Sequence, residues 1–360
     1  MSKTTEEILA ELRQRIDGID DRILELLNER ALVVMDVGKT KEGEKRDFYV
    51  PSREQAIYER LTSNNPGPFP ADGVRRVFRE IISASLSLEL PMKVAFLGPL
   101  ATFTHAATLQ QFGLSAQFVP QKSIPAVFDE VLRGRVNYGV VPVENSTEGI
   151  VSHTLDMFME SDLQIIAEVL LEISHDLMSR SGRLEDVRKV VSHPQALAQC
   201  RQWLEENLPD VTLMDVGSTA LAAQIVADDE SAAAVASEMA ASLYGLRVVK
   251  KKIEDNPNNF TRFLVIGKSS PPPSGRDKTS IMFSVKDQPG ILYRMLEPFS
   301  KRGINLSKIE SRPMKKKAWE YIFFLDIEGH LQETKVQEAL QDLKQHCQFL
   351  KALGSYPSAR

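Results

Sequence analysis

The chain has 360 residues, of which 42% are hydrophobic and 26% charged, with a formal net charge of −5. This length allows two or three domains, and a mildly acidic chain without a basic block indicates neither nucleic acid nor an anionic membrane as a partner. The two cysteines, Cys200 and Cys347, fit no CxxC or Cys/His pattern, so no disulfide framework or structural metal is expected. Because the N-terminal stretch is charged and no apolar run reaches about 18 residues, we expect a cytoplasmic protein.

The N-terminal region is predicted to be helical. Apolar residues recur every three or four positions from Thr5 to about Lys41, which predicts one helix about 55 Å long at ~1.5 Å per residue. Two shorter helices, predicted at about 53–62 and 72–90, cannot bury the whole apolar stripe, so a partner chain is expected. An antiparallel copy crossing near residue 24 would bring its Arg13 beside the 30–41 segment. Taken singly, the basic side chains of this helix are ordinary surface residues; they are Arg13, Arg30, Lys39 and Lys41. If they cluster inside a bundle, their charges require an anionic ligand.

This region resembles the all-helical chorismate mutase family over about residues 5–90, because LRQRIDGIDDRILELLNER, VGKTK, PSRE and IISASLSLE follow one another in the family's order. The resemblance implies a domain-swapped dimer that rearranges chorismate to prephenate. The implied site residues are Arg13, Arg30, Lys41, Arg53, Glu54, Ser85 and Glu89. Arginine forks would hold the dicarboxylate, and Lys41 would meet the negative charge that grows on the ether oxygen.

Glu89 departs from the family, in which glutamine often occupies this position. An ionised carboxylate would repel the ether oxygen, whereas a protonated one donates a hydrogen bond as an amide does. We therefore expect mutase activity to fall as the pH rises through neutrality. The loop of residues 43–50 also differs from some members, so Glu54 is the only contact to the substrate hydroxyl that we assign in this region.

From Pro91 to Gly267, short apolar strands alternate with polar turns and helical stretches, beginning with KVAFLGP and a helix capped by Thr102 or Thr104. This alternation predicts an α/β domain with a largely parallel sheet and ligands at the carboxyl ends of its strands. The residues at those mostly polar ends are Glu144, Asn145, Ser146, Ser192, His193, Pro194, Gln195, Ser218 and Thr219. Each alone is an ordinary helix cap, but together they suit a carboxylate ligand. Because no GxGxxG follows a strand, no dinucleotide cofactor is expected.

The stretch NPNNFTRF, residues 256–263, is a polar loop that leads into the apolar run LVIG. On an extended backbone Thr261 and Arg262 point in opposite directions. Composition alone favours an ordinary turn, whose asparagines tolerate unusual dihedrals. A loop delivered to a strand end is also where a scaffold commonly presents chemistry.

Six motifs in order, GPLATFTHAA, PVENSTEG, SHPQALAQC, STALAA, LYGL and NNFTRF, resemble prephenate dehydratase from about Lys93 to Gly267. The resemblance implies a two-lobed fold like that of periplasmic binding proteins, with the site between the lobes. Prephenate becomes aromatic when carbon dioxide and water leave, so the protein mainly has to help hydroxide depart.

The dehydratase site implied by this resemblance centres on Thr261, which would donate a hydrogen bond to the leaving oxygen. The other candidates are Asn145, Ser192 and Gln199 as positioning groups, Glu144 as a second proton donor or a loop cap, and Arg262 and Phe263 beside Thr261. His175 and His193 are expected to be structural. Because Ala101 replaces a family glycine, its loop is expected to differ in backbone conformation.

The residues 269–275, SSPPPSG, predict a stiff polar linker. The order strand, helix, strand, strand, helix, strand that follows is that of a ferredoxin-like domain. It resembles the ACT family through Gly290, Ile291, Leu292, Glu310, Ser311, Arg312 and Pro313. The resemblance implies that phenylalanine binds between two such domains and inhibits the dehydratase by favouring a closed dimer.

The expected fold class is therefore multidomain, with an all-α chorismate mutase domain (1–91), an α/β two-lobed dehydratase domain (92–268), a linker (269–278) and an α+β ferredoxin-like ACT domain (279–360). The resemblances imply a bifunctional enzyme of phenylalanine biosynthesis that converts chorismate to prephenate and then to phenylpyruvate. It would be a homodimer or higher oligomer, regulated by L-phenylalanine, without a cofactor or metal.

Two alternatives remain open. A mutase fused to prephenate dehydrogenase would need a nicotinamide fold, and the glycine fingerprint of that fold is absent. A non-catalytic amino-acid sensor is disfavoured by the joint presence of Arg13, Arg30, Lys41 and Thr261. An assay that starts from chorismate distinguishes them by whether phenylpyruvate forms.

Overall fold

The computed structural model describes residues 3–44, 49–89, 91–286, 288–313 and 321–359, except for the side chains of residues 41–44. The chain divides into two compact units, one of which contains most of the N-terminal helical region (residues 1–50 and 57–92) together with residues 112–116. Three helices open the chain: α1 (Thr5–Glu44), α2 (Pro51–Ser63) and α3 (Ala71–Glu89), as the apolar periodicity predicts. Pro51 starts α2 because a first-turn proline loses no intrahelical hydrogen bond.

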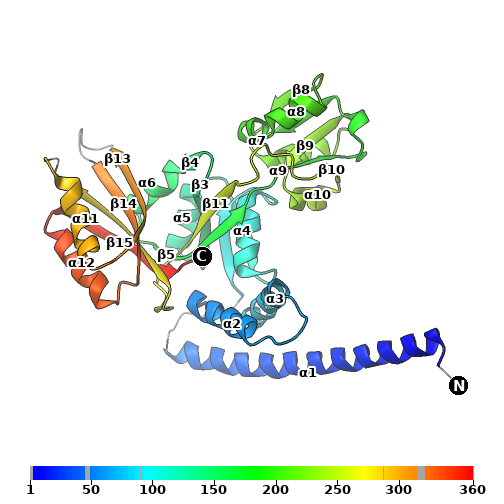
Figure 1. Ribbon diagram of the computed structural model, residues 1–360, viewed down its shortest axis with the longest axis horizontal. Coiled ribbons are helices and arrows are strands. Elements are labelled where there is room, and N and C mark those ends of the chain that lie inside the picture. Colours follow the sequence, from blue (N-terminus) through cyan, green and yellow to red (C-terminus); the bar gives the residue numbers. More distant parts are fainter. Residues whose placement is uncertain (1–2, 45–48, 90, 287, 314–320, 360) are drawn as a thin grey trace. The chain divides into compact units, whose positions relative to one another are not determined.

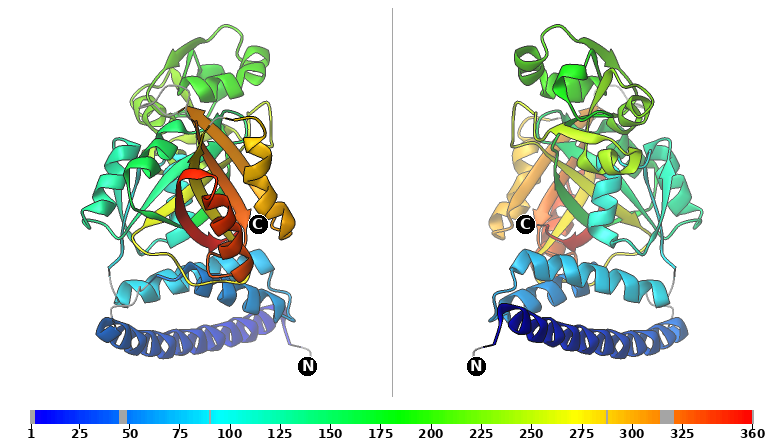
Figure 2. Two further views of the ribbon diagram at one scale, coloured as in Figure 1. Left: turned by 90° about the vertical axis from the view of Figure 1, so that its left-hand side faces the viewer. Right: turned by 90° about the vertical axis from the view of Figure 1, so that its right-hand side faces the viewer.

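Helix α1 is only partly covered by its neighbours. It packs against α3 through its C-terminal half, where Gly38 is buried, and the two helices run side by side in Figures 1 and 2. Its N-terminal half exposes a continuous row of aliphatic side chains: Ile8, Leu12, Ile16, Ile19 and Ile23 are each about half exposed. An exposed apolar stripe of this length is typical of a surface that binds a partner.

The central region folds into two lobes, each built on its own sheet (Figure 1). The first sheet has the order β2-β1-β3-β11-β5, with β4 added to β3. Its strands are β1 (Lys93–Leu97), β2 (Gln117–Gln121), β3 (Tyr138–Asn145), β4 (Gly149–Ile150), β5 (Gln164–Glu172) and β11 (Phe260–Gly267), and its helices are α4 (Phe103–Phe112), α5 (Ile124–Leu132) and α6 (Ser152–Glu160).

The second sheet has the order β10-β6-β9-β7-β8. Its strands are β6 (Asp176–Ser179), β7 (Lys189–Ser192), β8 (Thr212–Asp215), β9 (Ala232–Ala236) and β10 (Arg247–Lys250). Its helices are α7 (Pro194–Gln199), α8 (Arg201–Asn207), α9 (Thr219–Val226) and α10 (Glu238–Tyr244), and a short 3-10 turn, η1, spans Leu184–Asp186. Gly245 ends α10 in the left-handed conformation (φ 67°) that favours glycine.

The prediction of largely parallel sheets was wrong in part, because both sheets are mixed. β1 is parallel to β2 and β3, and β7 is parallel to β8 and β9, as strand–helix–strand crossovers require. The strands that run the opposite way are β4 and β11 in the first sheet and β6 in the second. Of these, β6 and β11 lie where the chain crosses between the lobes. It leaves the first lobe through β5 and β6 and returns through β10 and β11, so β11 runs against both β3 and β5.

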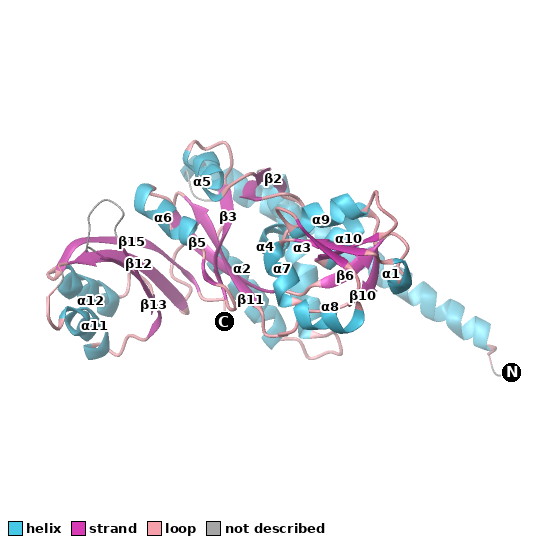
Figure 3. Ribbon diagram, turned by 90° about the horizontal axis from the view of Figure 1, so that it is seen from above, coloured by secondary structure: helices cyan, strands magenta, loops and turns pink. Residues whose placement is uncertain are grey.

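The C-terminal region is the predicted βαββαβ unit. Strands β12 (Asp277–Val285), β13 (Leu306–Pro313), β14 (Tyr321–Glu328) and β15 (Cys347–Pro357) form an antiparallel sheet in the order β13-β14-β12-β15. Helices α11 (Ile291–Lys301) and α12 (Thr334–Lys344) cover one face of it (Figure 3). Gly290 precedes α11 at φ 77°, which confirms that it opens this helix.

No helix in the described ranges is both long enough and apolar enough to cross a membrane.

Candidate active site

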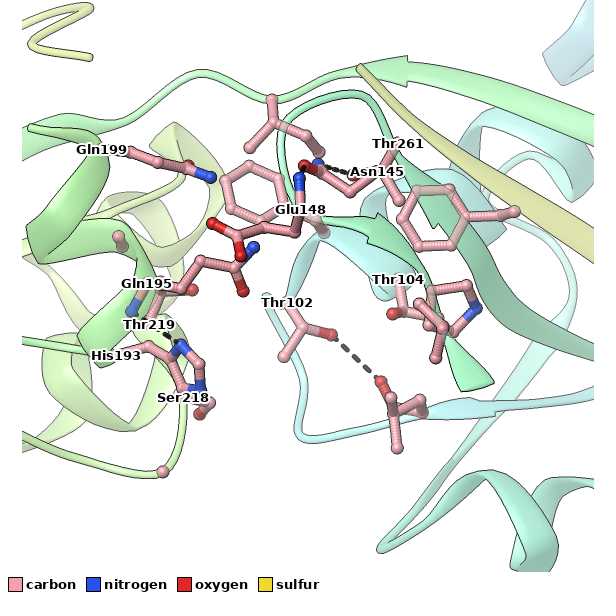
Figure 4. A pocket seen from close by; sticks show the side chains of 18 of the residues that line it. Thr102, Thr104, Asn145, Glu148, His193, Gln195, Gln199, Ser218, Thr219 and Thr261 are labelled. Atoms are coloured by element: carbon pink, nitrogen blue, oxygen red, sulfur yellow. Dashed lines mark hydrogen bonds between the residues drawn. The ribbon is translucent and has the colours of Figure 1, made fainter. Parts of the chain in front are cut away.

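A cavity of about 470 Å³ opens between the two lobes (Figure 4). Its walls combine a few aromatic and aliphatic side chains with many hydroxyl and amide groups. From the first lobe come Thr102, Phe103, Thr104, Pro142, Asn145, Glu148, Thr261 and Phe263, and from the second lobe and its crossing segment His175, His193, Gln195, Gln199, Ser218 and Thr219. A concave site between two lobes, in which a few polar groups point toward one another, is suited to a small polar ligand.

Two helices, α4 and α9, begin at this cavity with capped N-termini. The Thr102 hydroxyl accepts a hydrogen bond from the His105 amide at the start of α4, and the Ser218 hydroxyl accepts one from the Leu221 amide at the start of α9. Both caps were expected from the sequence. The helix N-termini carry partial positive charge, which favours an anionic ligand such as a carboxylate.

Thr261 lies at the cavity with its hydroxyl held by one neighbour. The side-chain amide nitrogen of Asn145 donates to the Thr261 hydroxyl oxygen at 2.7 Å. The amide oxygen of Asn145 accepts hydrogen bonds from the backbone N–H groups of Thr147 and Glu148, both at 3.0 Å, and these fix which end of the amide is the donor. Since Thr261 accepts this bond, its own hydrogen is available to a ligand.

A chain of side-chain hydrogen bonds continues from Asn145 across the cavity wall. The Asn145 amide also donates to Asn259 Oδ1 at 2.8 Å, and Asn259 Nδ2 donates to Gln199 Oε1 at 3.0 Å. Gln199 Oε1 lies 2.9 Å from Nε2 of His175. Residues from four separate segments are thereby tied into one polar wall.

Three expected dehydratase residues do not line the cavity. Ser192 is fully buried, and its hydroxyl donates to the Val235 carbonyl of the neighbouring strand at 2.6 Å. Glu144 forms a 2.6 Å ion pair with Lys308 of β13, so a role as a second proton donor has no support from its position. Arg262 points away from the cavity, opposite to Thr261, as the strand geometry predicts.

Arg262 belongs to a buried ionic cluster between β11 and the C-terminal sheet. Its guanidinium donates to Glu168 at 2.7 Å, to Asp326 at 2.6 Å and to the Tyr356 hydroxyl at 2.9 Å. Lys278 donates to both oxygens of Glu168. Two cations thus balance two carboxylates, as burial of charge requires. The strand that presents Thr261 is fastened on its opposite face to the ferredoxin-like domain.

Other contacts join the first lobe to the same domain. Arg312, predicted to bind or signal, donates to the Ser152 carbonyl at 2.6 Å and to Asp156 at 2.9 Å on α6. Gly354 of β15 lies so near β5 that a Cβ would overlap the Ile165 backbone. Gly290, Leu292, Ser311 and Pro313 are exposed, while Ile291 and Glu310 are half-buried. These residues remain candidates for an effector site.

The candidate mutase residues lie on all three N-terminal helices. Arg30 donates to the hydroxyl of Ser85, and burial lowers the pKa of Arg30 while Glu89 raises it. Gly38 makes room for Glu89, since a Cβ there would lie 3.1 Å from Glu89 Cγ. Arg13 is exposed on α1.

The remaining mutase candidates are on or before α2. Burial raises the pKa of Glu54 to about 8, and Arg53 beside it is exposed. Lys41 lies on α1, but its side chain falls outside the described part of the chain.

The first loop of the central domain has Ala101 at the position of the family's glycine. Ala101 lies at φ 62°, in the left-handed region, and is fully buried. Its N–H donates to His105 Nδ1, and its carbonyl accepts from the Ser237 hydroxyl. Surrounding contacts thus hold an alanine in a conformation that favours glycine. The expectation that this loop differs from the family in backbone conformation stays a prediction.

Sequence reasoning missed Glu148 and Asn259 and treated His175 as structural, yet Glu148 and His175 line the cavity and Asn259 bonds to its wall. A signal was present for Asn259, which sits two residues before Thr261 in a run of asparagines. His175 lies where the chain crosses between lobes, which only the fold reveals.

The model of the prephenate dehydratase family matches residues 94–271, that of chorismate mutase type II matches 12–90, and that of the ACT domain matches 279–345. The bifunctional chorismate mutase/prephenate dehydratase of Aquifex aeolicus is 54% identical over 98% of this chain and 99% of its own length. The enzyme of the same name from Pseudomonas aeruginosa is 47% identical over 98% of each chain.

A crystal structure of prephenate dehydratase from Arthrobacter aurescens in complex with L-Phe is 36% identical to this chain. It superposes with a TM-score of 0.70 over 74% of this chain and 90% of its own. These two relatives are about half identical to this chain along almost its entire length, and the three family models match it one after another. The matched residues therefore contain no dehydrogenase domain. The chain therefore belongs to the bifunctional chorismate mutase/prephenate dehydratases and carries both activities, with a C-terminal ACT domain.

Proposed function

We propose that the cavity between the lobes converts prephenate to phenylpyruvate, with Thr261 as the group that assists the leaving hydroxide. The observation that carries this role is the 2.7 Å hydrogen bond from Asn145 to the Thr261 oxygen, which leaves the threonine hydrogen free to donate. Among the described residues, the Thr261 hydroxyl donates to none. As the C–O bond breaks, charge grows on the departing oxygen, where a fixed donor stabilises it most.

The two carboxylates of prephenate find complementary charge at the N-termini of α4 and α9. Phe263 and Phe103 supply apolar wall next to the polar groups. One carboxylate leaves as carbon dioxide, and its departure is faster in a site that does not overstabilise the charged carboxylate. Asn145 and Gln199 act as positioning groups through the hydrogen-bonded wall.

Replacement of Thr261 by Val tests this role, because valine keeps the shape and removes the hydroxyl. We expect kcat for phenylpyruvate formation to fall by about 10²–10³-fold in Thr261→Val and Thr261→Ala, and less in Thr261→Ser. Mutase activity of the same chain serves as the folding control. Near-normal turnover in Thr261→Val would remove Thr261 from the mechanism, and a wild-type chain that makes no phenylpyruvate would favour the sensor alternative.

For the mutase, we propose that two chains pair through the exposed stripe of α1 and share their sites. The apolar row from Ile8 to Ile23 needs a cover, and an antiparallel copy crossing near residue 24 brings its Arg13 beside the 30–41 segment. The dicarboxylate chorismate then meets arginines from both chains. The proposed domain bounds are 1–91, 92–268 and 279–360, with the linker at 269–278.

A complementation experiment tests the shared site. Arg13→Ala and Lys41→Ala chains are each expected to be inactive as mutases. In their hybrid dimer one site recovers Arg13 from one chain and Lys41 from the other. After unfolding and refolding of a 1:1 mixture, about one quarter of wild-type activity should return, since half of the dimers are hybrids with one intact site. No recovery, or a fully active monomer in sedimentation, contradicts the proposal.

We further propose that L-phenylalanine binds between two ACT domains near Gly290 to Leu292 and Glu310 to Pro313, and lowers dehydratase activity. The Arg262 cluster and the Lys308–Glu144 pair link that domain to two of the strands that bear cavity residues, β11 and β3. A change in the ACT pairing can therefore alter the position of Thr261 or Asn145. Dehydratase rates that saturating phenylalanine leaves unchanged would refute this regulation.

A further inference from the structure

His175 is a buried histidine of the cavity wall with one ring nitrogen unused. Its side chain lines the cavity, and the residue is 2% exposed. Nε2 contacts Gln199 Oε1 at 2.9 Å, whereas Nδ1 has no hydrogen-bond partner among the described residues. A buried polar atom without a partner costs about 1–3 kcal/mol, so its presence in a native site calls for a ligand.

The tautomer of His175 follows from the hydrogen-bonded wall. Backbone N–H groups fix the Asn145 amide, so Asn259 Oδ1 is an acceptor and Asn259 Nδ2 a donor. Gln199 Oε1 must then accept from Asn259, and it can accept only from an Nε2–H on His175. A neutral ring that carries its hydrogen on Nε2 presents a bare lone pair at Nδ1.

The charge state of the ring agrees with this arrangement. Burial lowers the pKa of His175, while the Gln199 hydrogen bond and the charges of Glu254 and Asp176 raise it, with a net lowering. Glu254 is held by the backbone N–H of His175 at 2.8 Å, and Asp176 accepts from the Lys252 backbone at 2.9 Å, so both carboxylates are already engaged. The imidazole is therefore neutral near neutral pH, and Nδ1 is an acceptor.

We propose that Nδ1 of His175 accepts a hydrogen bond from the ring hydroxyl of the dehydratase substrate and so orients the leaving group toward Thr261. This inference rests on the proposed conversion of prephenate. With both carboxylates of prephenate ionised, its ring hydroxyl is its one hydrogen-bond donor, and Nδ1 of His175 is a buried acceptor without a partner among the described residues. The hydroxyl hydrogen goes to His175, and a lone pair of the same oxygen faces the Thr261 hydroxyl.

His175 neither gains nor loses a proton in this role. The C–O bond breaks with its electron pair on oxygen, and the electrons of the carboxylate C–C bond enter the ring as carbon dioxide leaves. The hydroxide departs with its own hydrogen and takes a second proton from solvent. Gln199 acts behind the histidine as a positioning residue, because it fixes both the orientation and the tautomer of the ring.

Two substitutions of His175 distinguish the roles of its two ring nitrogens. In His175→Asn the amide occupies the place of Nδ1 and the Nε2 contact is lost, whereas in His175→Gln the amide reaches the place of Nε2 and nothing replaces Nδ1. We expect His175→Gln to lose about tenfold in kcat/KM for prephenate, the worth of one hydrogen bond. The loss should fall mainly in kcat, because a misoriented hydroxyl still binds through the carboxylates. His175→Asn should retain more activity than His175→Gln.

His330 of the ACT domain supplies the matched control, since it is also a buried histidine (3% exposed) but lies outside the cavity, and its Nδ1 already accepts a hydrogen bond from the Gln332 amide. The same Asn and Gln exchanges at His330 should alter thermal stability rather than kcat for prephenate measured without phenylalanine. Mutase activity and the unfolding midpoint of each variant report on folding.

Several results would overturn the role of Nδ1. One is full dehydratase activity in His175→Gln with a loss in His175→Asn, which would make the histidine a structural support of Gln199. Another is equal activity of both variants, whether intact or impaired, as expected if a buried water satisfies Nδ1. The proposed function fails separately, if the unmodified chain forms no phenylpyruvate from prephenate.

Discussion

Replacement of Arg262 by Met should destabilise the protein strongly although it leaves the cavity wall untouched. The guanidinium makes three hydrogen bonds, to Glu168, Asp326 and Tyr356, and its side chain is 11% exposed. The two carboxylate side chains are 1% and 9% exposed. Removing one partner of a buried pair leaves an uncompensated charge, at a cost of about 3–5 kcal/mol.

The structure places this cost toward the lower limit. Lys278 still neutralises Glu168 at 2.8 Å, so Asp326 is the group that loses its counter-ion. Of the described side chains, the Ser280 hydroxyl is the hydrogen-bond partner that its carboxylate retains. We therefore expect about 3 kcal/mol, which corresponds to roughly 6–12 °C in the unfolding midpoint for domains of this size. The assay is urea and thermal unfolding of the unmodified chain and of Arg262→Met under the same conditions.

A double-mutant cycle identifies the cause. Asp326→Asn removes the stranded charge, so Arg262→Met/Asp326→Asn should be more stable than the sum of the single effects by about 1–3 kcal/mol. Arg201→Met is the control, because the Arg201–Glu205 pair is 75% and 64% exposed and should contribute less than about 1 kcal/mol. A loss of under 1 kcal/mol in Arg262→Met, or strict additivity in the cycle, would refute the reasoning.

Three further outcomes are expected. Ala101→Gly should change the free energy of unfolding by less than about 1 kcal/mol, since relief of the strained left-handed backbone offsets the lost methyl group. Ala107→Gly, in the middle of α4, should cost about 1–2 kcal/mol in the same urea titration. Equal costs of the two substitutions would contradict backbone strain at Ala101. The pKa of Glu54 is about 8 in the folded chain against an ordinary 4.5, so between these values the folded chain keeps a proton that the unfolded chain has lost. The free energy of unfolding should therefore fall as the pH rises from about 5 to 8. Glu54→Gln should make the urea midpoint less dependent on pH over this range. Mutase activity should fall as pH rises through neutrality and become level in Glu89→Gln, which initial rates on chorismate would reveal; an identical profile in the variant would exclude Glu89 as the donor to the ether oxygen.

Local rules account for the parts of the site that depend on neighbours in sequence. The spacing of three and four predicts α1, and a threonine or serine before an apolar helical stretch predicts the caps at Thr102 and Ser218. Strand alternation predicts that Thr261 and Arg262 face opposite ways. Each of these features is decided within a few residues of backbone.

The motif residues alone do not tell which face of a strand meets the ligand. Glu144 and Asn145 are adjacent on β3, yet Asn145 holds Thr261 while Glu144 pairs with Lys308, 164 residues away. Ser192 resembles a ligand-binding hydroxyl at a strand end, but the Val235 carbonyl of the next strand satisfies it. A hydroxyl bonds whatever acceptor the sheet order brings beside it.

The sequence by itself determined the family and the helix and strand order, and it singled out Thr261, which the structure finds among the residues that line the cavity. Only the tertiary structure decided that the sheets are mixed and that the Arg262 cluster fastens β11 to the ACT sheet. It also joined Asn145, Asn259, Gln199 and His175 into one wall. The physical reason is that a hydrogen bond between residues far apart in sequence depends on how the crossing strands bring the two lobes together. The spacing of apolar residues along the sequence does not specify that arrangement.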